Sequence, residues 1–178
     1  MKNRIYLIAL VLVGCLMSCE SESDDTIYQN ELEKSLAALS KFKKKTNNTY
    51  KYTVVGTSWI GVFWETTIVV THGKVTQRKY KCGNIEGYQN SIPKENAEWT
   101  ENKNQIGSHA YGFEPLTLDE VYAKAAQEWM PKREDVQTYF EIENDGLIST
   151  CGYEISGCAD DCFIGIRIKS IQALGSLF

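Results

Sequence analysis

Residues 50–54, Tyr-Lys-Tyr-Thr-Val, decide the fold because the hydrophobic period of the chain changes there. The two tyrosines and the valine alternate with polar neighbours, and this period of two predicts a strand with one buried face. The preceding residues, 27–46, have the period of an amphipathic helix instead. Their apolar side chains recur at spacings of three and four, at Tyr28, Leu32, Leu36 and Leu39.

Two more strands are expected after the first. Residues 65–71 are rich in β-branched side chains, His72-Gly73 is a tight-turn pair, and residues 74–82 alternate in polarity. Residues 83–115 show no persistent period, and a connection of about thirty residues is long against the usual length of about 4–6. This segment is either a functional loop or contains short strands that the pattern does not place.

The second half repeats the order of the first. Residues 117–120, Thr-Leu-Asp-Glu, form a capping box that starts a helix, and Pro131 ends it. Three strands are then predicted, at 136–143, 147–155 and 163–171. We therefore expect residues 27–178 to form a single α+β domain. Its two helices would pack on antiparallel sheet, in the order α-β-β-β-α-β-β-β.

The N-terminus resembles the export signal of a bacterial lipoprotein. Lys2 and Arg4 precede an apolar run of about 13 residues, shorter than the ~20 needed to span a bilayer. The run ends in residues 16–19, Leu-Met-Ser-Cys, which resemble a lipobox. This resemblance implies that residues 1–18 are a lipoprotein signal peptide and that Cys19 carries the lipid, including a palmitate chain. Residues 12–15, Leu-Val-Gly-Cys, also fit, but cleavage at Cys15 would leave two apolar residues on the mature end.

The residues after Cys19 are polar and acidic. The sequence Glu-Ser-Glu-Ser-Asp-Asp at 20–25 cannot bury apolar area, so residues 19–26 are predicted to be an acidic tether. The stretch resembles the acidic address of surface-exposed lipoproteins, and a plain solvated linker is the alternative. The expected location is the cell envelope, at the outer membrane or the cell surface, with the lipid anchor as the contact to the membrane.

Charge and composition restrict the partners. The chain contains 19 basic and 23 acidic residues, and removal of residues 1–18 takes away two basic residues and no acid, which leaves a net charge of −6. A chain this acidic is a poor nucleic-acid binder, because that affinity depends on neutralising phosphates. No nucleic acid and no cofactor are expected.

Four cysteines remain in the predicted mature chain: Cys82, Cys151, Cys158 and Cys162. An even number of cysteines in an oxidising compartment indicates two disulfides, although the sequence allows three pairings. We predict Cys158–Cys162 across a short turn and Cys82–Cys151 as a long-range link. The competing hypothesis is a zinc site at Cys158 and Cys162, for which only His72 and His109 could add imidazole.

The most distinctive local signal is residues 59–64, Trp-Ile-Gly-Val-Phe-Trp, at an expected hairpin tip. If these side chains are exposed, they form an apolar patch that marks a partner site. We therefore predict that Trp59, Phe63 and Trp64 bind a partner protein. The alternative is that they are buried under residues 83–115.

Three motifs in this order resemble an uncharacterised family of small bacterial lipoproteins, a domain of unknown function. They are Tyr-Lys-Tyr at 50–52, Thr-His-Gly-Lys-Val at 71–75 and Thr-Leu-Asp-Glu-Val-Tyr at 117–122. The resemblance covers about 110 residues, and each motif alone is short. It implies a fold of helices and strand meanders and implies no activity.

No catalytic motif is present, so we expect no enzyme and no catalytic residue. A nucleophilic serine motif, a zinc-protease motif and a phosphate loop are all missing. Asp160 and Asp161, with Asn144 and Asp145, offer calcium-type oxygen ligands, but not at the spacing of a known loop, and no metal is predicted. The first hypothesis is a non-enzymatic protein-binding module, for example an inhibitor or immunity protein. The alternatives are a carrier of a glycan or apolar molecule against Trp99, Tyr111 and Trp129, an envelope assembly accessory, and an enzyme of unrecognised type.

Overall fold

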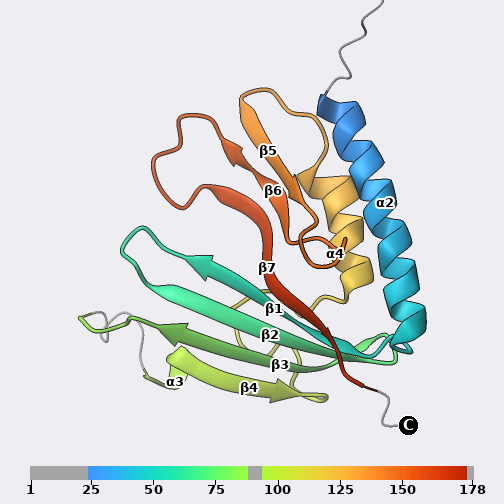
Figure 1. The fold of residues 1–178 in the computed structure, drawn as a ribbon. Helices are drawn as coiled ribbons and strands as arrows, with labels where there is room; N and C mark the ends of the chain where they lie inside the picture. The colour runs from blue at the N-terminus through green and yellow to red at the C-terminus, as the bar shows by residue number, and fades with distance from the viewer. Residues whose placement is uncertain (1–23, 88–93, 176–178) are drawn as a thin grey trace, which may run out of the picture.

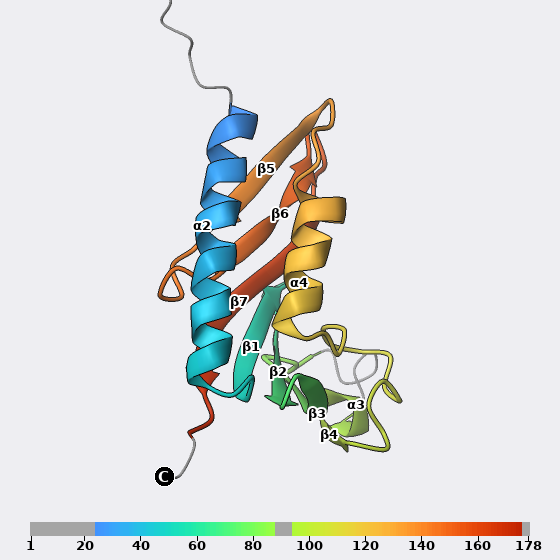
Figure 2. The same ribbon diagram turned by 90° about the vertical axis from the view of Figure 1, so that its right-hand side faces the viewer.

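The computed structural model describes residues 24–87 and 94–175. Within these ranges, seven strands form one antiparallel sheet in the order β4-β3-β2-β1-β7-β6-β5. The helices α2 (Asp24–Lys45) and α4 (Leu118–Lys124) lie on the same face of this sheet (Figures 1 and 2). The predicted α+β class, with two helices on antiparallel sheet, is confirmed.

The first half contains the predicted meander and one strand more. The strands β1 (Tyr50–Thr57), β2 (Phe63–Thr71) and β3 (Lys74–Gly83) follow one another as expected. A short helix, α3 (Lys94–Ala97), leads into β4 (Glu98–Asn102), which pairs with β3. Of the two explanations offered for residues 83–115, the one with a hidden strand is therefore correct. The predicted order omitted β4.

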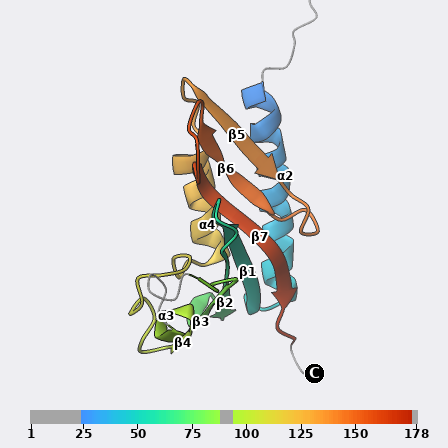
Figure 3. The same cartoon turned by 90° about the vertical axis from the view of Figure 1, so that its left-hand side faces the viewer.

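The second half adds three strands to the sheet, which join the first group through the pairing of β1 with β7. Its strands are β5 (Val136–Glu141), β6 (Thr150–Ile155) and β7 (Phe163–Ala173). Residues 50–54 of β1 pair with residues 168–173 of β7, so the two strand groups meet in one sheet. The face opposite the helices is not covered by α2 or α4, as the view in Figure 3 shows.

The stretch that opens β1 also fixes the second helix. Tyr50 and Tyr52 are fully buried beneath the helices. The Leu118 N–H donates to the Tyr50 hydroxyl at 2.8 Å, and the Tyr52 hydroxyl donates to the Leu116 carbonyl at 2.6 Å. Both bonds lie at the predicted capping box, in which Thr117 and Glu120 bond to each other. Helix α4 and a π-helical turn, η1 (Ala125–Trp129), follow the box. The capping box therefore both starts the helix and attaches it to the sheet.

A second buried cluster lies under the segment that connects β4 to α4. Tyr80 stacks on Trp99 with ring centroids 5.3 Å apart, and Trp99 stacks on His109 at 4.3 Å. Glu101 is fully buried beside them and forms an ion pair with Arg78 at 3.6 Å. The segment is held down further by a bond from the Phe113 N–H to the Thr66 hydroxyl at 2.9 Å. The long connection is therefore packed against the sheet, although it lacks regular structure.

Hydrogen bonds determine the charge of Glu101. Burial on its own raises the pKa of this carboxyl group. The backbone N–H groups of Gly107 and His109 donate to it at 2.7 and 2.6 Å, and Arg78 adds a positive charge. These interactions outweigh the burial and lower the pKa of Glu101, so the carboxylate stays ionised in the interior.

The predicted signal peptide and the Cys19 lipid site lie outside the described residues. Helix α2 begins at Asp24, so residues 24–26 of the predicted tether are helical. In the described part of the chain, no helix is long and apolar enough to span a membrane.

One of the two predicted disulfides forms. Cys158 and Cys162 are bonded, with their Cα atoms 6.0 Å apart. The prediction of a Cys82–Cys151 disulfide is wrong, because both cysteines are free and buried. Cys82 lies on β3 and Cys151 on β6, and four strand spacings between them amount to ~19 Å, whereas a disulfide needs Cα atoms within ~7 Å.

Candidate functional site

The candidate site is a cleft where the central strands β1 and β7 separate. Their last paired residues are Val54 and Ile168, directly after a bulge in the register. A bulge bends a strand and ends its pairing. Beyond this point the two strands diverge (Figure 1), and a cavity of about 500 Å³ lies between the ends of the β1–β2 and β6–β7 hairpins. We refer to this space as the β1–β7 cleft.

The outer end of the cleft is bounded by the turn that joins β1 to β2. The Ser58 N–H donates to the Val62 carbonyl at 2.8 Å, and the Gly61 N–H donates to the Ser58 carbonyl at 2.9 Å. Gly61 has φ +82°, a conformation that glycine adopts without strain. The Trp59 N–H donates to the Asp161 carboxylate at 3.2 Å, which connects this turn to the loop between β6 and β7. The two hairpin ends are thus joined across the cleft.

The three predicted partner-binding residues have different environments. Trp59 is 73 % exposed at the tip, and Phe63 is 43 % exposed on β2. Trp64 is half-buried. It packs against both hydrophobic clusters and lines the cleft. Its indole lies over Gly56, where an added Cβ atom would be 2.2 Å from the ring. Trp59 and Phe63 are therefore available to a partner, whereas Trp64 supports the site from below.

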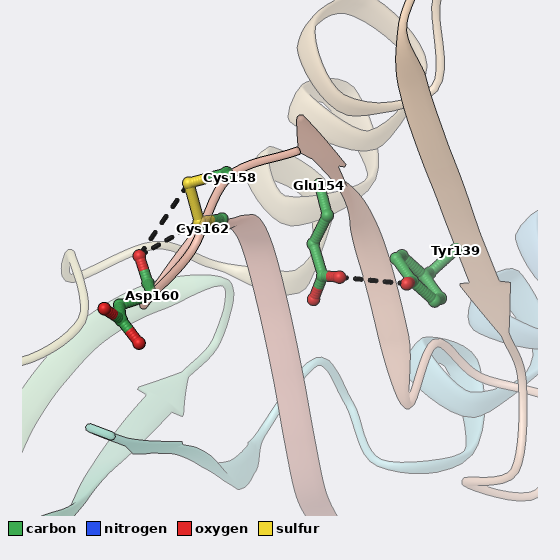
Figure 4. The surroundings of a disulfide bond; sticks show 5 residues. All are labelled: Tyr139, Glu154, Cys158, Asp160 and Cys162. Atoms are coloured by element: carbon green, nitrogen blue, oxygen red, sulfur yellow. Dashed lines mark hydrogen bonds between the residues drawn. A yellow bond between two sulfur atoms is a disulfide. The ribbon is translucent and has the colours of Figure 1, made fainter. Parts of the chain in front are cut away.

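The loop that holds Asp161 is closed by the Cys158–Cys162 disulfide (Figure 4). The Asp160 carbonyl oxygen lies 2.9 Å from the sulfur of Cys162 and 3.8 Å from that of Cys158. The loop also contains two positive-φ residues, Gly157 and Asp161. Because both sulfurs are used in the disulfide, they are not available as the thiolate ligands that the zinc hypothesis requires.

Charged and aromatic side chains line the cleft from the β6–β7 side. Glu154 accepts a hydrogen bond from the Tyr139 hydroxyl at 3.0 Å (Figure 4) and forms an ion pair with Arg167 at 3.5 Å. The Arg167 guanidinium also lies over the Phe163 ring, 3.6 Å from its centroid. The hydrogen bond to Glu154 raises the pKa of Tyr139. This network links the side chains along the wall of the cleft.

The side chains at the cleft can recognise a ligand through hydrogen bonds, charge and aromatic contact. Glu154 and Asp161 are acceptors, Arg167 is a donor, and Trp59 and Phe163 present aromatic surface. In the described residues, no group of three or more histidine, cysteine or acidic side chains is placed to hold a metal ion. Asn144, one of the calcium candidates, donates its amide to the carbonyls of Ile148 and Ile168.

The residues considered for a carrier site are not brought together. Trp129 lies in the main cluster under the helices, and Trp99 lies in the second cluster between Tyr80 and His109. Tyr111 is 53 % exposed on the surface of the connecting segment. These side chains line no common cavity among the described pockets.

Free thiols do not add a reactive group to the cleft. Cys151 is completely buried, and desolvation raises the pKa of its thiol to about 12. It therefore remains protonated at neutral pH, and a protonated thiol is a poor nucleophile.

Sequence reasoning did not identify Glu154, Phe163 and Arg167 as site residues. The alternation at 163–168 predicted the strand that carries two of them, but gave no reason to expect that residues 163–167 of β7 would be separated from β1, with pairing only from Ile168 onward. For Asp161 the sequence indicates only the chemistry of a calcium ligand.

Comparison with known proteins adds no assignment. No protein-family model, curated protein or solved structure matches this chain.

Proposed function

We propose that this protein is an envelope-anchored lipoprotein that acts as a non-enzymatic protein-binding module. The observation that carries the proposal is the exposed Trp59, which is held at the edge of the β1–β7 cleft by its bond to Asp161. An exposed tryptophan beside a pocket is the kind of anchor that dominates protein interfaces. The disulfide loop supports this role because it limits the movement of Asp161.

A surface whose residues are held together before a partner arrives favours a role in binding. A surface that is ordered before binding loses less conformational entropy when a partner docks. Here the tip is attached to the opposite hairpin, and Arg167 contacts both Glu154 and Phe163. An inhibitor or immunity-type protein that blocks a toxin or hydrolase would use such a surface.

The first prediction concerns the anchor. Replacement of the proposed lipid-bearing residue, Cys19→Ser, should abolish incorporation of labelled palmitate and release the protein from the membrane fraction. The physical reason is that the sulfur of Cys19 is the attachment atom, and the remaining acidic segment has no affinity for a bilayer. Cys15→Ser is the matched control and should label normally. Normal labelling of Cys19→Ser would contradict the proposal.

The second prediction concerns the tip. Trp59→Ala should weaken partner binding by at least roughly tenfold, because a buried interface tryptophan contributes ~2 kcal/mol or more. The measurement is quantitative recovery of chemically cross-linked partner from cells that express the wild-type or variant protein.

Tyr111→Ala is the control for that experiment. It removes another exposed aromatic side chain, on the segment between β4 and α4 and away from the cleft. Recovery should match the wild type. Equal recovery with Trp59→Ala and wild type would place the partner site elsewhere.

A further inference from the structure

The β1–β7 cleft lies between two strand edges that lack strand partners. Beyond Val54 and Ile168, no residue pair joins β1 to β7 in the described chain. β1 continues to Thr57 while paired only with β2, and β7 extends back to Phe163 while paired only with β6. Two antiparallel hairpins therefore end with facing, unpaired edges and a cavity between them.

Hydrogen bonds to the flanking strands β2 and β6 show which residues direct their backbone groups into the cleft. The Ser58 N–H points to Val62 on the β2 side, so its neighbour Thr57 directs its N–H and C=O the opposite way. The Ile168 N–H points to Ser149 on the β6 side. By the same alternation, Gly165 and Phe163 direct their backbone groups toward β1. Each edge thus offers donors and acceptors in the pattern of a strand.

Gly165 keeps the β7 edge accessible. Its φ is +152°, and a Cβ atom at this position would lie 2.2 Å from the Cys151 carbonyl oxygen on the adjacent strand. Glycine therefore permits the close approach of β7 to β6 and leaves no side chain on the cleft-facing residue.

The ionisable groups of the cleft favour a basic ligand. Its lining contains two carboxylates, Glu154 and Asp161, and one guanidinium, Arg167. One negative charge is therefore in excess, and a lysine or arginine of a partner would complement it.

We infer that the cleft receives an extended segment of a partner protein, containing a lysine or arginine, that inserts between β1 and β7 as an additional strand. This inference rests on the proposed function and names the form of its partner. Strand addition obtains affinity from backbone hydrogen bonds and specificity from alternate side chains. The inserted segment would form hydrogen bonds with the backbone N–H and C=O groups of Thr57, Gly165 and Phe163. Trp59 would contact the partner at the mouth of the cleft.

The test uses a displayed library of random linear peptides selected against the full-length protein in detergent. Enriched peptides should contain a basic residue, and their binding should slow hydrogen exchange at the amides of Thr57 and Gly165. The amides of Gly56 and Ile166 point to neighbouring strands, so they serve as internal controls and should be protected with and without peptide.

Thr57→Pro removes the N–H that faces the cleft without affecting the pairing to β2. The variant should bind the selected peptides roughly tenfold more weakly, because the peptide carbonyl that would accept from the Thr57 N–H is left without a donor. Thr57→Ala retains the N–H and should bind within about twofold of the wild type.

Three outcomes would overturn the inference: no enriched peptide, peptides that leave Thr57 and Gly165 exchanging freely, or equal binding to Thr57→Pro with the fold intact by circular dichroism. If Trp59→Ala loses the cellular partner but Thr57→Pro keeps it, the binding module stands and strand insertion fails. If Trp59→Ala keeps that partner, the partner site lies elsewhere, and the proposed function loses the observation that carries it.

Discussion

Glu101→Gln is expected to lower the free energy of unfolding by about 3–5 kcal/mol, the cost of breaking a buried ion pair by removing one partner. The carboxylate accepts two backbone N–H groups and faces Arg78, which is itself only 3 % exposed. Neutralising it leaves the guanidinium buried without its counter-charge. The same groups hold the segment between β4 and α4 on the sheet, since Arg78 donates to the carbonyls of His109 and Tyr111.

Urea denaturation at neutral pH measures this effect, and Glu98→Gln is the matched control. Glu98 lies on the same strand with an exposed side chain, and its ion pair with Lys79 is on the surface. The control should leave the stability close to that of the wild type, because an exposed ion pair contributes little. A Glu101→Gln protein as stable as the control would show that the buried pair does not hold this segment.

The pH dependence should have a defined sign. The folded protein lowers the pKa of Glu101 below its ordinary value of 4.5, so the ionised group stabilises the fold above that pH. This contribution is lost as the pH falls through the lowered pKa. The stability difference between wild type and Glu101→Gln should therefore be full at neutral pH and shrink on acidification.

Trp64→Ala should be the second strongly destabilising change, at about 3–5 kcal/mol. The indole packs against both hydrophobic clusters and covers Gly56 on the adjacent strand, so its removal opens a cavity where the clusters meet. Thermal unfolding followed by circular dichroism would measure the loss.

Trp59→Ala is the comparison for Trp64→Ala, because the two tryptophans belong to the same short sequence motif. Its side chain is 73 % exposed, and the bond to Asp161 uses the backbone N–H, which alanine retains. Stability should change by less than about 0.5 kcal/mol. Equal destabilisation by the two variants would mean that the tip is part of the core and not a docking surface.

The sequence predicted elements with strong local signals. The spacing of Tyr28, Leu32, Leu36 and Leu39 predicted α2, and the alternation from Tyr50 predicted β1, because both patterns depend only on neighbouring residues. Leu36 of that stripe is nevertheless exposed. β4 was missed because Glu-Trp-Thr-Glu-Asn has a single large apolar side chain and is five residues long. Its position depends on Tyr80 and Arg78, which lie on another strand.

The site was harder to predict because it depends on strand order. The residues at 59–64 could be singled out by their apolar and aromatic content, but the contact between Trp59 and Asp161 spans 102 positions. It exists because β1 pairs with β7 and then separates from it, and no local pattern encodes that pairing. The same reason explains the disulfides: the Cys158–Cys162 bond is local, whereas the Cys82–Cys151 prediction required knowledge of which strands are neighbours.

Titration of the cross-linked partner, once purified, into isotope-labelled full-length protein tests the central claim most directly. Nuclear magnetic resonance should show the largest shifts at the Trp59 indole N–H, with further shifts at Ser58, Asp161 and Gly165. Shifts confined to α2, α4 or the segment between β4 and α4, with the Trp59 signal unchanged, would contradict a binding surface at the β1–β7 cleft.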